Sequence, residues 1–240
     1  MLQSVMADHG PAALITVFDP PPPTFRHELY PPYKANRPVP PDEFLDECWD
    51  LTQLLRDNGV PVYEEAGFEA DDVLGTLAKQ ASQSGLRSLV YTCDLDLLQI
   101  INENTLVEVF SQYWPKRLFD MESASRRFNG IMPANIPDLK ALMGDRSDNL
   151  PGVPGIGEKS ASAILRNTGD IETLYADLDA VLELQLRGSR RIHKLLTENE
   201  TQAFLMKRLA TIDLNVPVTL KLPVTEFQSC NLRSMASRYQ

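Results

Sequence analysis

Short apolar runs that end in an acidic residue alternate with helical patterns along the first part of the chain. The run LITVF, residues 14–18, ends at Asp19, and SLVYT, residues 88–92, ends at Cys93 and Asp94, with a third run near 62–64. Helical patterns at 43–56 and 73–82 separate these runs. Strands connected through helices are typical of a parallel sheet, in which every strand ends at the same edge. We therefore predict an α/β fold with a functional site at that edge.

The third run leads into a helical pattern that begins with a cluster of acids. In GFEADDVLGTLAKQA, residues 67–81, apolar side chains recur at three- and four-residue intervals, which is typical of a helix packed on one face. Glu69, Asp71 and Asp72 occupy its first turn. Acids at this position also complement the helix dipole, and aspartate is a common helix cap, so each group alone has an ordinary structural explanation.

A further pair of acids, Asp145 and Asp148, lies in the turn GDRSDNLPG, which follows the helical pattern PDLKALM. With the acids near the strand ends they make eight candidate metal ligands: Asp19, Glu69, Asp71, Asp72, Asp94, Asp96, Asp145 and Asp148. Carboxylates gathered in one site repel one another, and hard divalent cations are their natural complement. We therefore expect two Mg²⁺ or Mn²⁺ ions.

The segment GVPGIGEKSASAILRN, residues 152–167, is the most specific single motif in the chain. Gly152, Gly155 and Gly157 precede a helical pattern and allow the backbone to approach a ligand closely. The free N–H groups at the start of that helix, with Lys159 beside them, suit a phosphate whatever base it carries. The alternative is an ordinary glycine-rich turn between two helices.

A proline-rich stretch, residues 25–44, interleaves cations with aromatic side chains. Half of the chain's 18 prolines lie between residues 20 and 41. Cations mixed with Tyr30 and Tyr33 suit a single-stranded nucleic acid, although a solvated proline-rich loop is the alternative. The cations of interest in this stretch are Arg26, Lys34 and Arg37. A second cationic group, in LRGSRRIHKLL, is more typical of a solvated helix face.

The overall charge argues against a nucleic-acid partner until its distribution is considered. The 240 residues carry a formal net charge of −10 and are 43% hydrophobic. Carboxylates that hold divalent cations inflate the negative count without repelling a polyanion once the metal is bound. No apolar run approaches the length of a membrane span and no secretion signal is recognisable, so we expect a cytoplasmic protein without a membrane partner.

These motifs together resemble those of the 5′ nucleases, a family that includes flap endonucleases and the 5′-nuclease domain of bacterial DNA polymerases. The matching pieces cover nearly all of residues 14–217 and are VFD, FRHELYPPYKANRP, GFEADDVLGTLA, TCDLDLLQI and GDRSDNLPGVPGIGEKSA. The resemblance implies a parallel-sheet, PIN-like nuclease core over residues 1–135, with an arch at 20–44. It implies a helical DNA-binding region over residues 136–240, with a helix-hairpin-helix (helix-three-turn-helix) element at 150–167.

The same resemblance implies a structure-selective 5′-3′ exonuclease and 5′-flap endonuclease that hydrolyses DNA. The eight acids would hold two divalent metals that activate water for in-line attack on a phosphodiester. The hairpin would grip duplex DNA and could hold K⁺. A DNA polymerase is an expected partner, and a monomer is the expected state. The residues assigned to catalysis are Arg26, Lys34, Asp72 and Asp94, and those assigned to DNA binding are Arg26, Lys34, Arg37, Gly152, Gly155, Gly157, Lys159 and Ser160.

Two departures from the family pattern bear on activity. Leu95 stands between Asp94 and Asp96, where the family usually has lysine. The family's opening strand, which ends in Asp-Gly, has no counterpart before Leu14, and MLQSVMADHG resembles the tail of the helix that follows it. We therefore expect upstream codons to encode that strand and one more metal-binding aspartate. A DNA-binding protein with a crippled nuclease site and an RNA-cleaving enzyme remain alternative hypotheses.

Overall fold

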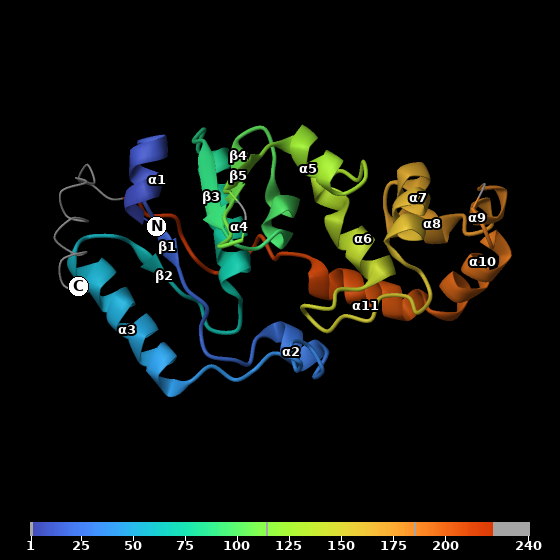
Figure 1. Ribbon diagram of the computed structural model, residues 1–240, viewed down its shortest axis with the longest axis horizontal. Helices are drawn as coiled ribbons and strands as arrows, with labels where there is room; N and C mark the ends of the chain where they lie inside the picture. The colour runs from blue at the N-terminus through green and yellow to red at the C-terminus, as the bar shows by residue number, and fades with distance from the viewer. Residues whose placement is uncertain (1, 114, 185, 223–240) are drawn as a thin grey trace.

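The computed structural model describes residues 2–113, 115–184 and 186–222, and these form an elongated molecule with two unlike ends (Figure 1). The strands lie toward one end, and the helices α7 (Glu158–Thr168) to α10 (Ser189–Glu198) lie at the other. Between them, α6 (Ile136–Met143) packs along α11 (Glu200–Ala210). The predicted α/β fold with a helical C-terminal part is confirmed.

The strands form two small sheets instead of the one continuous parallel sheet that the sequence predicts. In the first sheet, β1 (Thr16–Val17) pairs in parallel with β2 (Val62–Tyr63). In the second, β3 (Ser88–Thr92) pairs in parallel with β4 (Thr105–Val109), and β5 (Arg117–Phe119) joins β4 in the antiparallel direction. No strand pairing connects β1 to β3 within the described ranges. The acids that follow β1, β2 and β3 therefore come from two separate sheets.

Helix α4 (Ala70–Gln83) holds the two sheets together, because it contacts both β1 and β3. Its buried side chains Val73 and Leu77 pack with Val17 of β1, whereas Ala78 belongs to the main core. The N–H of Glu69 donates to Oδ2 of Asp72 at 3.0 Å and fixes the first turn of the helix. One rigid helix thus presents its acidic start to the ends of strands from both sheets.

Six further elements complete the N-terminal part. Among them, α1 (Leu2–His9) is tied to β4 by a contact of 3.0 Å between Nε2 of His9 and Glu108. In α3 (Asp42–Asp57), Leu55 is buried, but most of the first two turns are exposed. These elements are α1 (Leu2–His9), α2 (Phe25–Leu29), α3 (Asp42–Asp57), the 3₁₀ helix η1 (Asp96–Ile100), α5 (Met121–Arg127) and the 3₁₀ helix η2 (Pro133–Asn135).

The helical part has an apolar core of its own that continues into the α/β part. Leu139 and Leu142 of α6, Leu165 of α7 and Met206 of α11 are buried in it. The short helices α8 (Ile171–Ala176) and α9 (Ala180–Glu183) connect α7 to α10. The predicted helical region extends to residue 240, and its last residues, 223–240, lie outside the described part of the chain. No helix in the described ranges is both long and apolar enough to cross a membrane.

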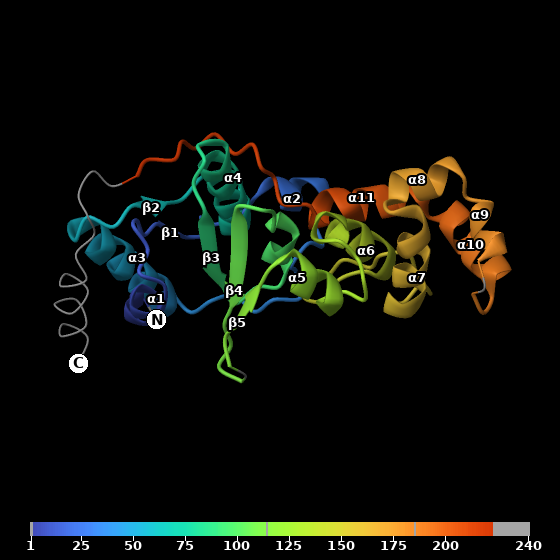
Figure 2. The same cartoon turned by 90° about the horizontal axis from the view of Figure 1, so that it is seen from above.

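After α11 the chain returns along α4 as an extended segment, residues 211–222, which we call the strap (Figure 2). The Thr76 hydroxyl donates to the carbonyl of Asp213 at 3.2 Å and accepts the N–H of Val216 at 3.1 Å. One turn later, Gln80 bonds the strap twice, at 2.8 and 2.7 Å. The strap therefore connects the helical end of the molecule to the helix that carries the acids.

Candidate functional site

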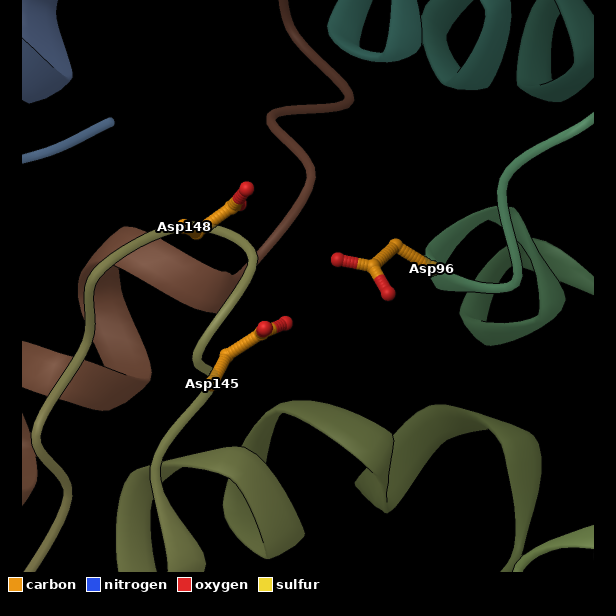
Figure 3. Close-up of side chains that lie close together, drawn as sticks. All are labelled: Asp96, Asp145 and Asp148. Carbon is orange, nitrogen blue, oxygen red and sulfur yellow. The ribbon is translucent and has the colours of Figure 1, made fainter. Parts of the chain in front are cut away.

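Three carboxylates from distant parts of the chain converge in the structure. Asp96 begins η1, whereas Asp145 and Asp148 lie in the turn after α6. One oxygen from each lies within 4.8 Å of the other two, and Figure 3 shows the side chains close together. Asp148 is buried and the other two are partly buried. Three such oxygens are suitable ligands for a hard divalent cation.

A second acidic group forms where α4 begins. Asp19, which follows β1, accepts the N–H of Ala70 at 2.7 Å and so brings the strand end to the start of the helix. Burial, together with the negative charges of Asp94, Asp19 and Glu69, raises the pKa of Asp71 to about 8. Acids from three strand ends therefore act on one another here. A bound cation would relieve this repulsion.

Lys140 of α6 is buried beside the first group of acids, Asp96, Asp145 and Asp148. The sequence motifs do not predict a lysine at this site. Its ammonium donates to the carboxylates of Asp96 and Asp145. Burial raises the pKa of Asp96 to about 6, in spite of the opposing charge of Lys140. Burial would also raise the pKa of Asp145, but Lys140 and hydrogen bonds from Ser147 outweigh it and hold that pKa at about 2. Lys140 thus neutralises part of the acidic group.

Residues 30–37 of the expected arch lie against the turn that carries Asp145 and Asp148. The Tyr33 hydroxyl lies 3.0 Å from Glu69 and 3.1 Å from Asp148, so it connects the two acidic groups. Lys34 donates to Glu69 at 2.6 Å, and Arg37 donates to Asp148 at 2.7 Å. Burial and the two carboxylates raise the pKa of Tyr33. Because Tyr33 is only 2% exposed, its ring does not present the aromatic surface that the sequence suggested for single-stranded nucleic acid.

Arg26 and Asp72, which the resemblance assigns to catalysis, form a buried ion pair. Two guanidinium nitrogens donate to the two oxygens of Asp72 at 2.6 and 2.7 Å. Arg26 also donates to the carbonyls of Leu209 and Thr211 at 2.8 and 2.9 Å, and the N–H of Asp213 donates to Asp72 at 2.8 Å. The exposed fractions are 3% for Arg26 and 0% for Asp72. A contact of Arg26 with DNA, or of Asp72 with a metal, would have to replace these bonds.

The glycine-rich segment is bonded to the turn that carries the acids. Asp145 and Leu150 exchange two backbone hydrogen bonds of 2.7 Å. A Cβ atom placed on Gly152 would lie 2.2 Å from the backbone nitrogen of Gly144, and Gly152 has a φ of +62°. Only glycine fits this close backbone approach. Gly152 therefore joins the hairpin loop to the acidic turn and is itself buried.

The exposed part of the segment lies around residues 155–159. Gly155 is exposed with a φ of +91°, and Gly157 is the exposed N-cap of α7. Lys159 and Ser160 lie in the first turn of α7, where backbone N–H groups are free of helical partners. Within the described ranges, no ion pair or hydrogen bond engages the ammonium of Lys159. These residues offer the loop's accessible positive surface.

Both halves of the chain match one family of proteins. Residues 1–129 match the 5′-3′ exonuclease, N-terminal resolvase-like domain, and residues 131–233 match the 5′-3′ exonuclease, C-terminal SAM fold. The chain belongs to the 5′-3′ exonuclease family. A 5′-3′ exonuclease of Buchnera aphidicola subsp. Baizongia pistaciae is 34% identical to it, over 92% of this chain and 72% of the relative. The family resemblance that the motifs predicted is therefore confirmed.

This member of the 5′-3′ exonuclease family is also similar to parts of larger proteins. DNA polymerase I of Chloroflexus aurantiacus is 39% identical to it over 92% of the chain, which corresponds to 23% of the polymerase. The chain spans about a quarter of the length of the DNA polymerase I relatives it matches. A solved structure of T5 5′-exonuclease with bound zinc shares its fold, with a TM-score of 0.71, 24% identity, and coverage of 88% of this chain and 79% of that one.

Three features of this exonuclease-family site could not be recognised with the motifs alone. Lys140 had a weak signal, because it is the one basic residue in the pattern PDLKALM. The positions of Tyr33 and of the pair Arg26 and Asp72 depend on contacts between residues far apart in sequence. Of the eight predicted acids, Asp96, Asp145 and Asp148 converge, Asp19, Glu69, Asp71 and Asp94 lie near the start of α4, and Asp72 is paired with Arg26.

Proposed function

We propose that the protein is a metal-dependent nuclease that removes nucleotides or short oligonucleotides from 5′ ends and 5′ flaps of DNA. The observation that carries the proposal is the convergence of Asp96, Asp145 and Asp148 beside the acidic start of α4. Membership of the 5′-3′ exonuclease family supports it. The site is built from oxygen ligands, and no protein nucleophile is required for hydrolysis by metal-activated water.

Two divalent ions, Mg²⁺ or Mn²⁺, fit the two acidic groups. The fit is supported by donor sets that consist of carboxylates and by the raised pKa values of Asp71 and Asp96, which reflect burial and mutual repulsion. When bound, such ions lower the pKa of water and stabilise negative charge on the reacting phosphate. In this proposal the first ion is held by Asp96, Asp145 and Asp148, and the second by Asp19, Glu69, Asp71 and Asp94.

Lys34 and Arg37 are proposed to bind the phosphate to be cleaved. Their side chains are 19% and 47% exposed, so both are accessible at the border of the acidic groups. Each donates to a single carboxylate, Glu69 or Asp148, and can exchange that partner for a phosphate oxygen when the acids bind metal. Tyr33 is proposed to hold the two acidic groups in fixed positions relative to each other, because its hydroxyl contacts Glu69 in one and Asp148 in the other.

For Arg26 and Asp72 we propose a positioning role. Their bidentate pair fixes α2, the first turn of α4 and the beginning of the strap relative to one another. Breaking a buried ion pair by removing one partner typically costs about 3–5 kcal/mol. Asp72→Asn is therefore expected to reduce both cleavage and the free energy of unfolding, whereas Asp94→Asn should reduce cleavage alone. Thermal unfolding of the two variants separates these roles.

The hairpin loop is proposed to hold the backbone of duplex DNA through Gly155, Gly157, Lys159 and Ser160. Gly152 supports it from within by packing against Gly144. A K⁺ ion on the loop's carbonyl oxygens, a DNA polymerase partner, a monomeric state and a cytoplasmic location belong to the same proposal. The DNA polymerase I relatives support the link to a polymerase. Exchange of K⁺ for Na⁺ should weaken duplex binding if the ion is held there.

The test uses 5′-flap DNA, single-stranded DNA and RNA of the same sequence, each incubated with Mg²⁺, Mn²⁺ or EDTA. We expect cleavage near the 5′ end or flap junction of the DNA in Mg²⁺ or Mn²⁺, and none in EDTA. Binding to the flap without cleavage in any metal would favour the crippled DNA-binding protein. Cleavage confined to RNA would favour the third hypothesis and would contradict this proposal.

A further inference from the structure

A group of arginines at the helical end of the molecule takes no part in the site described above. Arg187 precedes α10, and Arg190 and Arg191 lie in its first turn; all three are exposed. Across residues 2–113, 115–184 and 186–222, no ion pair or hydrogen bond engages their guanidinium groups. The next cation along the helix, Lys194, has a partner in Glu198 at 3.6 Å. Three neighbouring arginines are therefore available to a ligand.

The position of Arg190 and Arg191 destabilises the start of α10. The first turn of a helix favours acids because of the helix dipole, yet the first turn of α10 has no acid and carries Arg190 and Arg191. With Lys194, Arg190 and Arg191 lie within about 100° of the helix circumference, opposite the buried Ile192 and Leu196. Like charges on one face repel one another. In a chain with a net charge of −10, such a face is better explained by an anionic partner than by solvation alone.

The arginine face adjoins the hairpin loop. A Cβ atom placed on Gly155 would lie 2.8 Å from Nη2 of Arg191 and 3.2 Å from Cδ1 of Leu195. The guanidinium of Arg191 thus lies against the backbone of Gly155, in space that the missing side chain leaves open. Gln202 of α11 donates to the carbonyl of Gly152 and holds the other end of the loop. The loop and the arginine face of α10 therefore adjoin at Gly155 and Arg191.

We propose that Arg187, Arg190 and Arg191 extend the phosphate contacts of the hairpin loop along the backbone of duplex DNA. This inference rests on the proposed function, because it assigns a further part of the same substrate. Guanidinium groups bind phosphate oxygens in a bidentate manner and read no sequence. Surfaces for single strands combine cations with aromatic rings on which bases stack, and α10 carries no phenylalanine, tyrosine or tryptophan. A duplex backbone is therefore the ligand that fits.

The test measures binding of fluorescent 5′-flap DNA in EDTA, with a short and a long duplex arm, over a range of salt concentrations. The variants are Arg191→Gln and the triple variant Arg187→Gln, Arg190→Gln, Arg191→Gln. Each arginine removed should weaken binding about three- to tenfold and lower the magnitude of the slope of log K against log salt concentration by about 0.9. The loss should be the same on unrelated sequences and larger on the long arm. All three side chains are exposed, so the variants should fold.

Arg87→Gln is the matched control, because Arg87 is an exposed arginine in the turn between α4 and β3 and its substitution removes the same charge. It should change binding by less than about twofold. The inference is overturned if the triple variant binds like the unmodified protein, if Arg87→Gln weakens binding as much as Arg191→Gln, or if the unmodified protein binds no DNA. Absence of cleavage in Mg²⁺ with binding intact would count against the nuclease proposal. The binding measurements in EDTA would still test the role of the arginines.

Discussion

Two partly buried carboxyl groups, those of Asp71 and Asp96, have pKa values above the ordinary range of aspartates. Their pKa values are raised to about 8 and about 6, first by burial. A carboxyl whose pKa is raised in the folded state lowers the free energy of unfolding at pH values above that pKa. This destabilisation is lost as the pH falls toward the ordinary pKa of 3.8. Asp145, whose pKa is lowered to about 2, instead raises the free energy of unfolding. This stabilisation is lost only when the pH falls below the ordinary pKa of 3.8.

The metal-free protein should therefore become more stable as the pH is lowered from about 8.5 to about 5.5. We expect the Tm in EDTA to rise by about 3 °C or more, which corresponds to roughly 1 kcal/mol in a domain of this size. Asp71→Asn cannot ionise and should lose most of this dependence. Scanning calorimetry of both proteins measures it, and a Tm that falls over the same interval would show that these carboxyls are ionised.

Lys140 provides the second prediction for a single side chain. Its ammonium is the internal partner of Asp96 and Asp145 and is only 5% exposed. In Lys140→Met the acids lose that partner, so the protein in EDTA should be about 3–5 kcal/mol less stable, while the rise in Tm on adding Mg²⁺ should be larger than in the unmodified protein. Lys140→Arg keeps the charge and serves as the control. An equal response to Mg²⁺ in Lys140→Met would mean that the ammonium does not compete with the metal.

The hairpin loop and the acidic turn form one hydrogen-bonded unit, in which the backbones of Gly144 and Gly152 touch. Gly152→Ala would place a methyl group 2.2 Å from a backbone nitrogen, at a positive φ. We expect it to weaken DNA binding and cleavage together, because both parts of the unit must shift. Gly169→Ala is the matched control, since Gly169 also has a positive φ, of +85°, but a Cβ atom there meets nothing within 4 Å. If Gly152→Ala changed binding alone, the loop and the acids would be independent.

The strands and helices predicted from local sequence patterns agree with the structure. Features that depend on contacts between residues far apart in sequence could not be predicted. The apolar runs near 16–17, 62–63 and 88–92 and the helix over 70–83 follow from periodicity and composition. The division into two sheets could not be predicted, because pairing between strands depends on their tertiary placement. The same holds for Tyr33, whose partners Glu69 and Asp148 lie 36 and 115 residues away. Carboxylates at strand ends and the cations Arg26, Lys34 and Arg37 are visible as motifs, whereas the buried partner Lys140 is not.

The proposed function places chemistry and DNA binding at different points along the length of the molecule. The candidate acids lie at strand ends, at the start of α4 and in the turn after α6, whereas Arg187, Arg190 and Arg191 lie next to or on α10, at the far end of the molecule in Figure 1. The net charge of −10 does not describe the local charge, because eight of the 33 acids are candidate metal ligands and three exposed arginines lie together at α10. The strap and α11 connect the two ends through Asp72 and Arg26. DNA held at the helical end would be directed toward the acids.

The most direct test of this account is cleavage of a 5′-flap DNA in Mg²⁺ by the unmodified protein and by Asp94→Asn, with binding measured in parallel in EDTA. Asp94 contributes to the charge that acts on Asp71 and Asp96 and does not belong to the hairpin loop. We expect the unmodified protein to cut the flap and Asp94→Asn to cut it at least about a hundredfold more slowly, with binding changed by less than about twofold. Cleavage that survives in Asp94→Asn, or that proceeds in EDTA, would contradict the assignment of the chemistry to metals held by these acids.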